Sequence, residues 1–252
     1  MTEKLKIIYY AILNKYFKHL LYLTIFFLRK KIFQNIKYKE LYSYRESKKK
    51  CKLYLISKKK LYLYFCKKKK IKNFQIKNKF LKYSTKLQNK KMGGGSDIQL
   101  IYNLIIIQKP MNIIEFGVAS GWSTVSILEA TKKNGFGNLE SFDMPYFFQG
   151  SKKMIGNMVK KKYKNWRLFV GPQINYFNKI KKKYDFCHYD SDKSYQGRIL
   201  AYDKIWKSLK KDAIFISDDI GDNVAFFDFC YHKKIKPFVV QYKNKYLGLI
   251  SK

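Results

Sequence analysis

The segment from Glu115 to Ser123 has residue types and a spacing that suit a ligand with an anionic group. It reads Glu-Phe-Gly-Val-Ala-Ser-Gly-Trp-Ser, with a G-x-x-x-G pattern at Gly117 and Gly121. Glycines let the backbone approach a ligand closely, and Ser123 stands where we expect a helix to begin, so that free N–H groups there can hold an anion. The pattern differs from the G-x-G-x-x-G of dinucleotide-binding folds, and many strand-to-helix turns carry one pair of glycines.

An acidic residue, Asp143, follows the next apolar run, residues 139–142. An acid at the end of a second strand can accept hydrogen bonds from both hydroxyls of a ribose. The alternative is an ordinary cap of a helix or turn. Together with the glycine loop, Asp143 favours an adenosine-containing ligand.

A second set of charged residues follows two later apolar runs. Asp190 and Lys193 come after one run, and Asp218 and Asp219 come after the other. Carboxylates that converge repel one another unless a cation or a proton lies between them, and Mg²⁺ prefers a few carboxylates together with water and substrate oxygens. A buried lysine beside them could take a proton from a substrate hydroxyl. The alternatives are helix capping for Asp190 and a polar loop for the Asp218-Asp219 pair.

Alternating strands and helices would bring these residues to one edge of a sheet. Short apolar runs and segments with helical periodicity alternate from residue 112 onward, which predicts an α/β fold with a Rossmann-like, doubly wound, mostly parallel seven-stranded sheet and a C-terminal antiparallel strand. Ligands of such sheets bind outside the carboxyl ends of the strands. The expected strands are 112–116, 139–142, 166–170, 184–189, 213–217, 238–241 and 246–250, and the expected helices are 122–133, 151–164, 174–182, 195–209 and 223–232.

The composition divides the chain of 252 residues in two. All 13 glycines and all 4 prolines lie after residue 91, and residues 1–91 carry a net formal charge of +25 out of the total of +37. A stretch without turn-forming residues is a poor compact globule, so we expect residues 1–91 to be a basic extension that is helical or partly disordered. Residues 92–252 are long enough to bury a core, and Met92-Gly93-Gly94-Gly95-Ser96 is expected to be a flexible junction.

Residues 113–124 resemble the first motif of class I S-adenosylmethionine-dependent methyltransferases, and Asp143 falls where that family has its ribose-binding acid. The segments 189–195 and 211–219 are similar to the small-molecule O-methyltransferase branch. The resemblance covers about residues 93–250 and preserves the order of the motifs. It implies S-adenosylmethionine as cofactor and a methyl acceptor that is a hydroxyl of a small molecule or glycan precursor.

The resemblance also implies roles for individual residues. Glu115 and the loop from Gly117 to Gly121 would face the methionine group, Ser123 its carboxylate, Asp143 the ribose, and Gly171 the adenine. In the metal-dependent branch, Asp190, Asp218 and Asp219 would hold a divalent ion such as Mg²⁺, and Lys193 beside Asp190 would be the catalytic base. This chain departs from that branch at Asp219, where the branch has asparagine.

The N-terminal part allows several readings. Residues 5–28 are rich in apolar side chains and are followed by Arg29-Lys30-Lys31, which could form a basic helix on an anionic membrane surface, with contact through residues 5–31, or a helix docked on the rest of the chain. Lysine runs interleaved with aromatic residues over 37–91 could grip a nucleic acid, or could reflect the composition bias of the source. In either case the charge predicts salt-dependent, non-specific attraction to polyanions.

Other classes of function receive less support. Four cysteines without C-x-x-C spacing do not indicate a zinc site or a disulfide framework, and nothing in the sequence indicates export, so we expect a cytoplasmic protein, with or without contact to the inner face of the membrane. The alternatives to an O-methyltransferase are a nucleic-acid methyltransferase that uses the basic extension and a non-catalytic S-adenosylmethionine-binding module. The Tyr-Asp-Ser-Asp sequence at 189–192 does not match the motif of enzymes that methylate the amino groups of bases.

Overall fold

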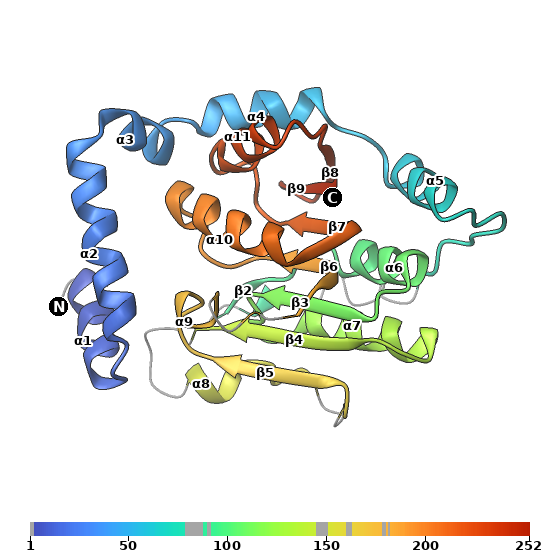
Figure 1. Ribbon diagram of the computed structural model, residues 1–252, viewed down its shortest axis with the longest axis horizontal. Helices are drawn as coiled ribbons and strands as arrows, with labels where there is room; N and C mark the ends of the chain where they lie inside the picture. The colour runs from blue at the N-terminus through green and yellow to red at the C-terminus, as the bar shows by residue number, and fades with distance from the viewer. Residues whose placement is uncertain are drawn as a thin grey trace.

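The computed structural model of the protein describes residues 3–78, 88–89, 92–144, 151–159, 163–177, 180 and 182–252 (Figure 1). In the C-terminal part the helices are α6 (Ile98–Gln108), α7 (Trp122–Asn134), α8 (Ser151–Met154), α9 (Ile174–Phe177), α10 (Tyr195–Ser208) and α11 (Ala225–His232). The strands of the main sheet are β3 (Asn112–Phe116), β4 (Asn138–Asp143), β5 (Trp166–Val170), β6 (Tyr184–Tyr189), β7 (Leu209–Ser217), β8 (Phe238–Tyr242) and β9 (Lys245–Ser251). Two-residue strands β1 (Gln88–Asn89) and β2 (Gly93–Gly94) pair with each other.

The described strands build one seven-stranded sheet in the order β5-β4-β3-β6-β7-β9-β8. Neighbours from β5 to β7 are parallel, whereas β9 runs antiparallel to both β7 and β8. The predicted Rossmann-like sheet with a C-terminal antiparallel strand is therefore confirmed. The order of the strands reverses at β3, so that the carboxyl ends of β3 and its neighbours face the site where ligands of such sheets bind.

Alternate residues of the strands build two core layers, one on each face of the sheet. Ile113 of β3 packs in the layer that contains α5 (Lys58–Lys68), α6 and α7. The next residue, Ile114, packs in the layer that contains α10 and α11. Because successive side chains of a strand point to opposite faces, apolar runs without polar alternation are what a sheet covered on both faces requires.

Several expected boundaries differ from the structure. The expected helix 151–164 is reduced to α8, because Gly156 takes a φ of +70° and its N–H donates to the Ala119 carbonyl instead of continuing a helix. The described part of the expected helix 174–182 ends at Phe177. Strand β7 begins four residues earlier than expected, where Leu209 pairs with Tyr184 before a shift of register. Helix α6, which the pattern did not predict, is an almost fully buried helix.

The N-terminal extension is helical over its described length and docks on the sheet domain. Besides α5, its helices are α1 (Glu3–Leu13), α2 (Phe17–Ile32), α3 (Gln34–Leu41) and α4 (Tyr44–Leu53). Figure 1 shows them in a chain around the outside, from α1 and α2 at one edge, past α4 beside α11, to α5 beside α6. Two lysines, Lys15 and Lys70, take the left-handed conformation where no glycine is available, with φ values of +56° and +55°.

Contacts between the extension and the sheet domain are specific. The N–H of Ile56 donates to the Val239 carbonyl (2.9 Å), and the N–H of Val239 donates to the Tyr54 carbonyl (3.1 Å), so residues 54–56 lengthen the sheet beyond β8. The Ser47 hydroxyl donates to the carbonyl oxygen of Ile220 (2.6 Å). The core layers thus cross the expected boundary at residue 92. Within the expected junction, Met92 is buried, and Gly93 and Gly94 form β2.

Within the described ranges, no helix combines the length and the apolar character needed to cross a membrane.

Candidate active site

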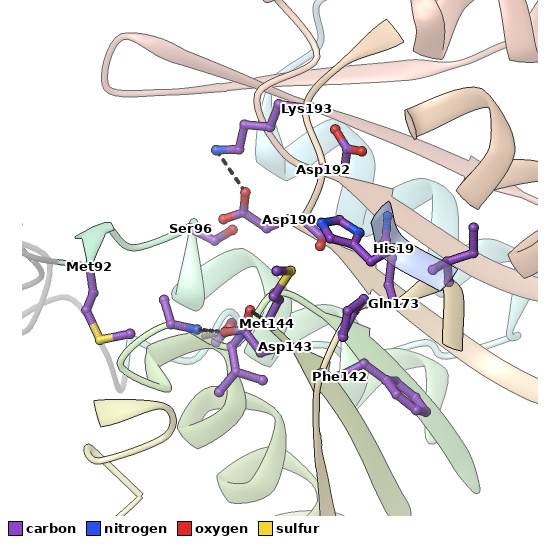
Figure 2. Close-up of a pocket in the computed structure, with 18 of the residues that line it drawn as sticks. His19, Met92, Ser96, Phe142, Asp143, Met144, Gln173, Asp190, Asp192 and Lys193 are labelled. Carbon is purple, nitrogen blue, oxygen red and sulfur yellow. Dashed lines mark hydrogen bonds and ion pairs between the residues drawn. The ribbon is translucent and has the colours of Figure 1, made fainter. Parts of the chain in front are cut away.

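A cavity of about 460 Å³ lies at the carboxyl ends of β3, β4 and β6 (Figure 2). Ligand pockets typically span roughly 300–1,000 Å³, so the cavity can hold a small ligand. Its walls come from segments that follow strands and from α2 of the extension. They include the loop 117–120, Ser123, Asp143, Met144, Gly171, Pro172, the segment 190–193, His19, Tyr22 and Leu23.

The glycine loop after β3 is held by its close approach to β6. Gly117 has a φ of +89°, and a Cβ atom on it would lie 1.9 Å from the Asp190 carbonyl oxygen. The N–H of Asp190 in turn donates to the Phe116 carbonyl at 2.7 Å. Gly121 precedes α7 with a φ of +97°, at a point where the loop lies against Gly156. Position 117 requires a positive φ and leaves no space for a Cβ atom, and only glycine meets both requirements. This explains the first glycine of the G-x-x-x-G pattern.

Asp143 connects the end of β4 to the glycine loop and also lines the cavity. Its Oδ2 accepts hydrogen bonds from the N–H groups of Val118 (3.0 Å) and Ala119 (2.6 Å), and its Oδ1 accepts one from Met144 (2.7 Å). Burial raises the pKa of Asp143 to about 6, against the opposite effect of these backbone hydrogen bonds. A carboxylate oxygen accepts two hydrogen bonds, so Oδ1 retains capacity for a ligand hydroxyl.

Glu115 lies behind the loop instead of lining the cavity, which differs from its expected contact with the methionine group. Its carboxylate is fully buried and accepts hydrogen bonds from Ser123 (2.6 Å), Thr124 (2.8 Å) and Ser141 (2.7 Å). These hydroxyls satisfy a buried charge that would otherwise be costly. Ser123 does line the cavity, but its hydroxyl is directed to Glu115.

The charged residues expected at the reaction centre come together in part. The Lys193 ammonium lies 3.1 Å from Asp190 Oδ1 and also contacts Asp219, and Lys245 lies 3.1 Å from Asp219 Oδ1. Burial lowers the pKa of Lys193, but the neighbouring Asp190 and Asp219 carboxylates outweigh it and raise that pKa overall. In the same way, burial raises the pKa of Asp219, and the two lysines outweigh it and lower that pKa. Lys193 is therefore a protonated donor here, whereas a base needs a free electron pair.

Asp218 lies inside the protein, where burial and the nearby Asp190 carboxylate raise its pKa. It is buried, and its Oδ1 lies 3.7 Å from Nε2 of His188. The other nitrogen of His188, Nδ1, lies 3.7 Å from Glu115. Burial lowers the pKa of His188, but the carboxylates on both sides outweigh it and raise that pKa to about 10. His188 therefore connects the two buried acids behind the cavity.

The residues do not fit the expected divalent ion. Among the side chains that the structure describes, no group of three or more His, Cys, Asp or Glu is arranged to hold a metal. The Lys193 ammonium takes the space between Asp190 and Asp219, and Asp218 points to His188. Two lysines thus supply the positive charge that convergent carboxylates require.

Sequence reasoning missed the residues that α2 contributes. His19, Tyr22 and Leu23 line the cavity, and the Tyr22 hydroxyl donates to Oδ2 of Asp192 at 3.3 Å. In Figure 2, His19 lies on the side of the cavity opposite Met92. Burial lowers the pKa of His19, with a smaller opposite effect from Asp192, so its imidazole is neutral at neutral pH. The signal in the sequence that could have indicated His19 was its position as a polar residue within the apolar run of residues 5–28.

Hydrogen bonds from α3 secure the same region. Lys39 forms an ion pair with Asp228 of α11 (2.6 Å) and a hydrogen bond to the Tyr195 hydroxyl (3.1 Å). Glu40 accepts a hydrogen bond from the N–H of Gln196 in the first turn of α10 (2.9 Å). An acid suits this position, since the N-terminus of a helix carries a partial positive charge. These contacts fix the end of α2 next to the cavity.

Comparisons with known proteins agree with the fold. Residues 114–220 match a family described as a methyltransferase domain. An O-methyltransferase from Bacillus cereus in complex with SAH is 15% identical, with a TM-score of 0.53 over 68% of this chain and 87% of that chain. The SAH-bound methyltransferase PaMTH1 from Podospora anserina is 14% identical, with a TM-score of 0.52 over 77% and 94%. A search of curated proteins gave no match.

A further solved structure, a putative caffeoyl-CoA O-methyltransferase from Staphylococcus aureus, is 13% identical, with a TM-score of 0.53 over 76% of this chain and 99% of that chain. At these identities the likeness shows the fold. Residues 114–220 thus match a methyltransferase domain, and the sheet agrees with the resemblance of residues 113–124 to class I S-adenosylmethionine-dependent methyltransferases.

Proposed function

We propose that the protein transfers the methyl group of S-adenosylmethionine to a hydroxyl oxygen of a small molecule or glycan precursor. The observation that carries the proposal is the cavity at the carboxyl ends of β3 and β4, where Asp143 and the glycine loop meet. The chain shares its fold with proteins that were crystallised with SAH or SAM. When bound, S-adenosylmethionine would supply an activated methyl group on a sulfonium.

The residues of the cavity suit the parts of such a cofactor. Oδ1 of Asp143 has the remaining capacity to accept a hydrogen bond from one hydroxyl of a ribose, and Gly171 and Pro172 offer an uncharged wall for a flat base. Ser123, in the first turn of α7, lies where a carboxylate would meet the backbone N–H groups of a helix N-terminus. The reaction then needs mainly positioning of the acceptor oxygen in line with the methyl group.

The acceptor hydroxyl would lose its proton to His19 rather than to Lys193. Both residues line the cavity, but the ion pairs of Lys193 with Asp190 and Asp219 hold it as an ammonium, whereas His19 is neutral. A neutral imidazole can accept a proton near pH 7. Lys193 would instead orient Asp190 and balance its charge, and neither role needs a metal ion between the acids.

A calorimetric titration of S-adenosylmethionine into the full chain tests the proposal. Asp143→Ala removes the acceptor for the diol and should weaken binding by about 1–3 kcal/mol, or roughly 5- to 150-fold in Kd. Asp203→Ala is the matched control, because Asp203 forms an exposed ion pair with Lys233 on α10 and α11. Wild-type protein that is folded and does not bind S-adenosylmethionine would overturn the proposal, and equal binding by both variants would remove Asp143 from it.

A further inference from the structure

Helix α2 has two distinct faces. One face is half-buried and includes His19, Tyr22 and Leu23, which line the cavity. The opposite face exposes large apolar side chains at intervals of three or four residues, with exposed fractions from 44% to 68%. We call this set the apolar stripe; its members are Phe17, Leu21, Ile25, Leu28 and Ile32. Residues at this spacing lie on one side of a helix.

Helix α1 exposes a similar set next to α2. Leu5, Ile8 and Ile12 are all more than 40% exposed, and Figure 1 shows α1 beside the lower half of α2 at the edge of the molecule. The rings of Tyr10 and Tyr16 lie 6.2 Å apart and connect the two helices. Large exposed apolar patches are rare on a soluble monomer unless they meet a partner or a membrane.

The charge around the apolar stripe limits what can cover it. Lys18, Arg29 and Lys31 are exposed on α2, and no acidic residue occurs between positions 4 and 39. A second copy of the chain docked through this face would bring like charges together, which opposes a dimer. An anionic lipid surface offers both the apolar layer and the opposite charge.

We propose that the exposed face of α2 docks on an anionic lipid surface. The apolar stripe would enter the boundary between headgroups and acyl chains, and Lys18, Arg29 and Lys31 would contact lipid phosphates. The helix has 16 residues and is therefore about 24 Å long, shorter than the roughly 30 Å of a bilayer core, so it lies along the surface. The same helix forms one wall of the cavity.

The position of α2 between the cavity and the lipid surface also limits the class of methyl acceptor. This step rests on the proposed methyl transfer. Because His19 and Tyr22 lie on the face opposite the apolar stripe, the cavity would be held one helix diameter, about 10–12 Å, from the lipid headgroups. A hydroxyl on the headgroup side of a membrane-bound amphiphile can reach across that distance. The acceptor class is therefore a lipid-linked hydroxyl compound.

Co-sedimentation of the full chain with vesicles tests the docking surface. The vesicles contain phosphatidylcholine alone or phosphatidylcholine and phosphatidylserine at 7:3. The double variant Leu21→Glu/Ile25→Glu alters the apolar stripe, and Leu53→Glu/Leu63→Glu is the matched control, since it makes the same charge change at leucines of α4 and α5 that are 75% and 60% exposed. We expect the wild type and the control to bind the anionic vesicles, and the stripe variant to bind at least about tenfold more weakly.

Other outcomes overturn the proposal. Equal binding by the two double variants would show general attraction of the +37 charge to anionic surfaces. A dimer in light scattering that the stripe variant loses, without lipid binding by the wild type, would assign the face to a second copy. The affinity for S-adenosylmethionine in solution is measured on each variant, so that a failure of lipid docking is distinguished from misfolding and from a failure of the proposed function.

Discussion

At the scale of single residues, the acidic side chains at the cavity differ in pKa, and Asp143 is the clearest case. Its carboxyl is buried against the glycine loop and has a pKa near 6, well above the usual value of an aspartate. Asp190 and Asp219, in contrast, are paired with Lys193. The same type of side chain therefore suits different tasks: Asp143 can change its proton near neutral pH, whereas Asp219, whose pKa the neighbouring lysines lower, is held as an ion.

The raised pKa of Asp143 predicts a pH dependence of cofactor binding. Above pH 6 the group is a carboxylate, whose Oδ1 can accept a hydrogen bond from a ribose hydroxyl. Below pH 6 the carboxyl is protonated and loses part of its capacity to accept hydrogen bonds. We expect the affinity for S-adenosylmethionine to be constant near pH 7 and to fall as the pH decreases through 6 to 5. Calorimetry at several pH values measures this, and Asp143→Asn should flatten the profile. A wild-type profile that is flat between pH 5 and 7 would contradict the assignment.

A prediction for His19 follows from its position in the cavity and its neutral imidazole. His19→Asn keeps a polar side chain of similar size but removes the base, so turnover should fall by about 10²- to 10⁴-fold, while the Kd for S-adenosylmethionine changes little. Release of S-adenosylhomocysteine in the presence of phenols, sugar alcohols or vesicles that carry a lipid-linked alcohol measures turnover. His232→Asn, an exposed histidine at the end of α11, serves as the control. Normal turnover by His19→Asn would assign the proton transfer to another group.

Elements of the fold meet at Glu115. This residue of β3 accepts hydrogen bonds from α7 through Ser123 and Thr124 and from β4 through Ser141, and it faces His188 of β6. One buried carboxylate thus connects a helix and three strands directly behind the glycine loop. The acid of the motif supports the cavity through these contacts rather than by touching a ligand.

Glu115→Ala should destabilise the fold by about 3–5 kcal/mol, because it leaves buried hydroxyls and the charged His188 without their partner. Urea unfolding followed by circular dichroism measures the loss. Glu115→Gln retains a hydrogen-bond acceptor and a similar volume, and we expect it to lower the free energy of unfolding by less than Glu115→Ala does. If Glu115→Ala unfolds at the wild-type urea concentration and loses only cofactor affinity, Glu115 acts on the ligand and not on the fold.

At the scale of the whole molecule, the extension and the sheet domain share both core layers. Leu61, Tyr62 and Phe65 of α5 are buried in the same layer as α6 and the sheet, and Cys51 of α4 is buried in the other layer. The extension therefore contributes to both cores. Its charge does not prevent this, since the lysines of these helices remain at the surface while apolar positions turn inward.

Leu61→Ala tests whether the extension and the sheet domain unfold together. The cavity left by the buried Leu61 side chain should destabilise the entire chain by about 2–5 kcal/mol. Leu63→Ala on the same helix is 60% exposed and should change stability by less than about 0.5 kcal/mol. Thermal unfolding, followed both by circular dichroism and by loss of S-adenosylmethionine binding, compares them. If Leu61→Ala leaves the transition of the cofactor site unchanged, the extension and the sheet domain unfold separately.

The sequence by itself determined the order of strands and helices, the sheet class, the glycine loop and the position of Asp143, because these depend on local periodicity and on residues close together in the chain. Expected strands such as 112–116, 166–170 and 184–189 coincide with β3, β5 and β6. Where a boundary was wrong, as in the helix expected at 151–164, a contact from Gly156 to the distant Ala119 decided the outcome.

The tertiary structure alone decided which side chains meet. Tyr22 and Asp192 are 170 positions apart and share a hydrogen bond, and Glu40 caps a helix 156 positions away. No spacing rule encodes such pairs, since they arise when apolar faces of separate elements pack. Tertiary contacts also decide the charge of Lys193. The motif suggests Lys193 as a base, but its contact with Asp219 keeps it protonated. Packing between distant segments, not residue type, assigned these roles.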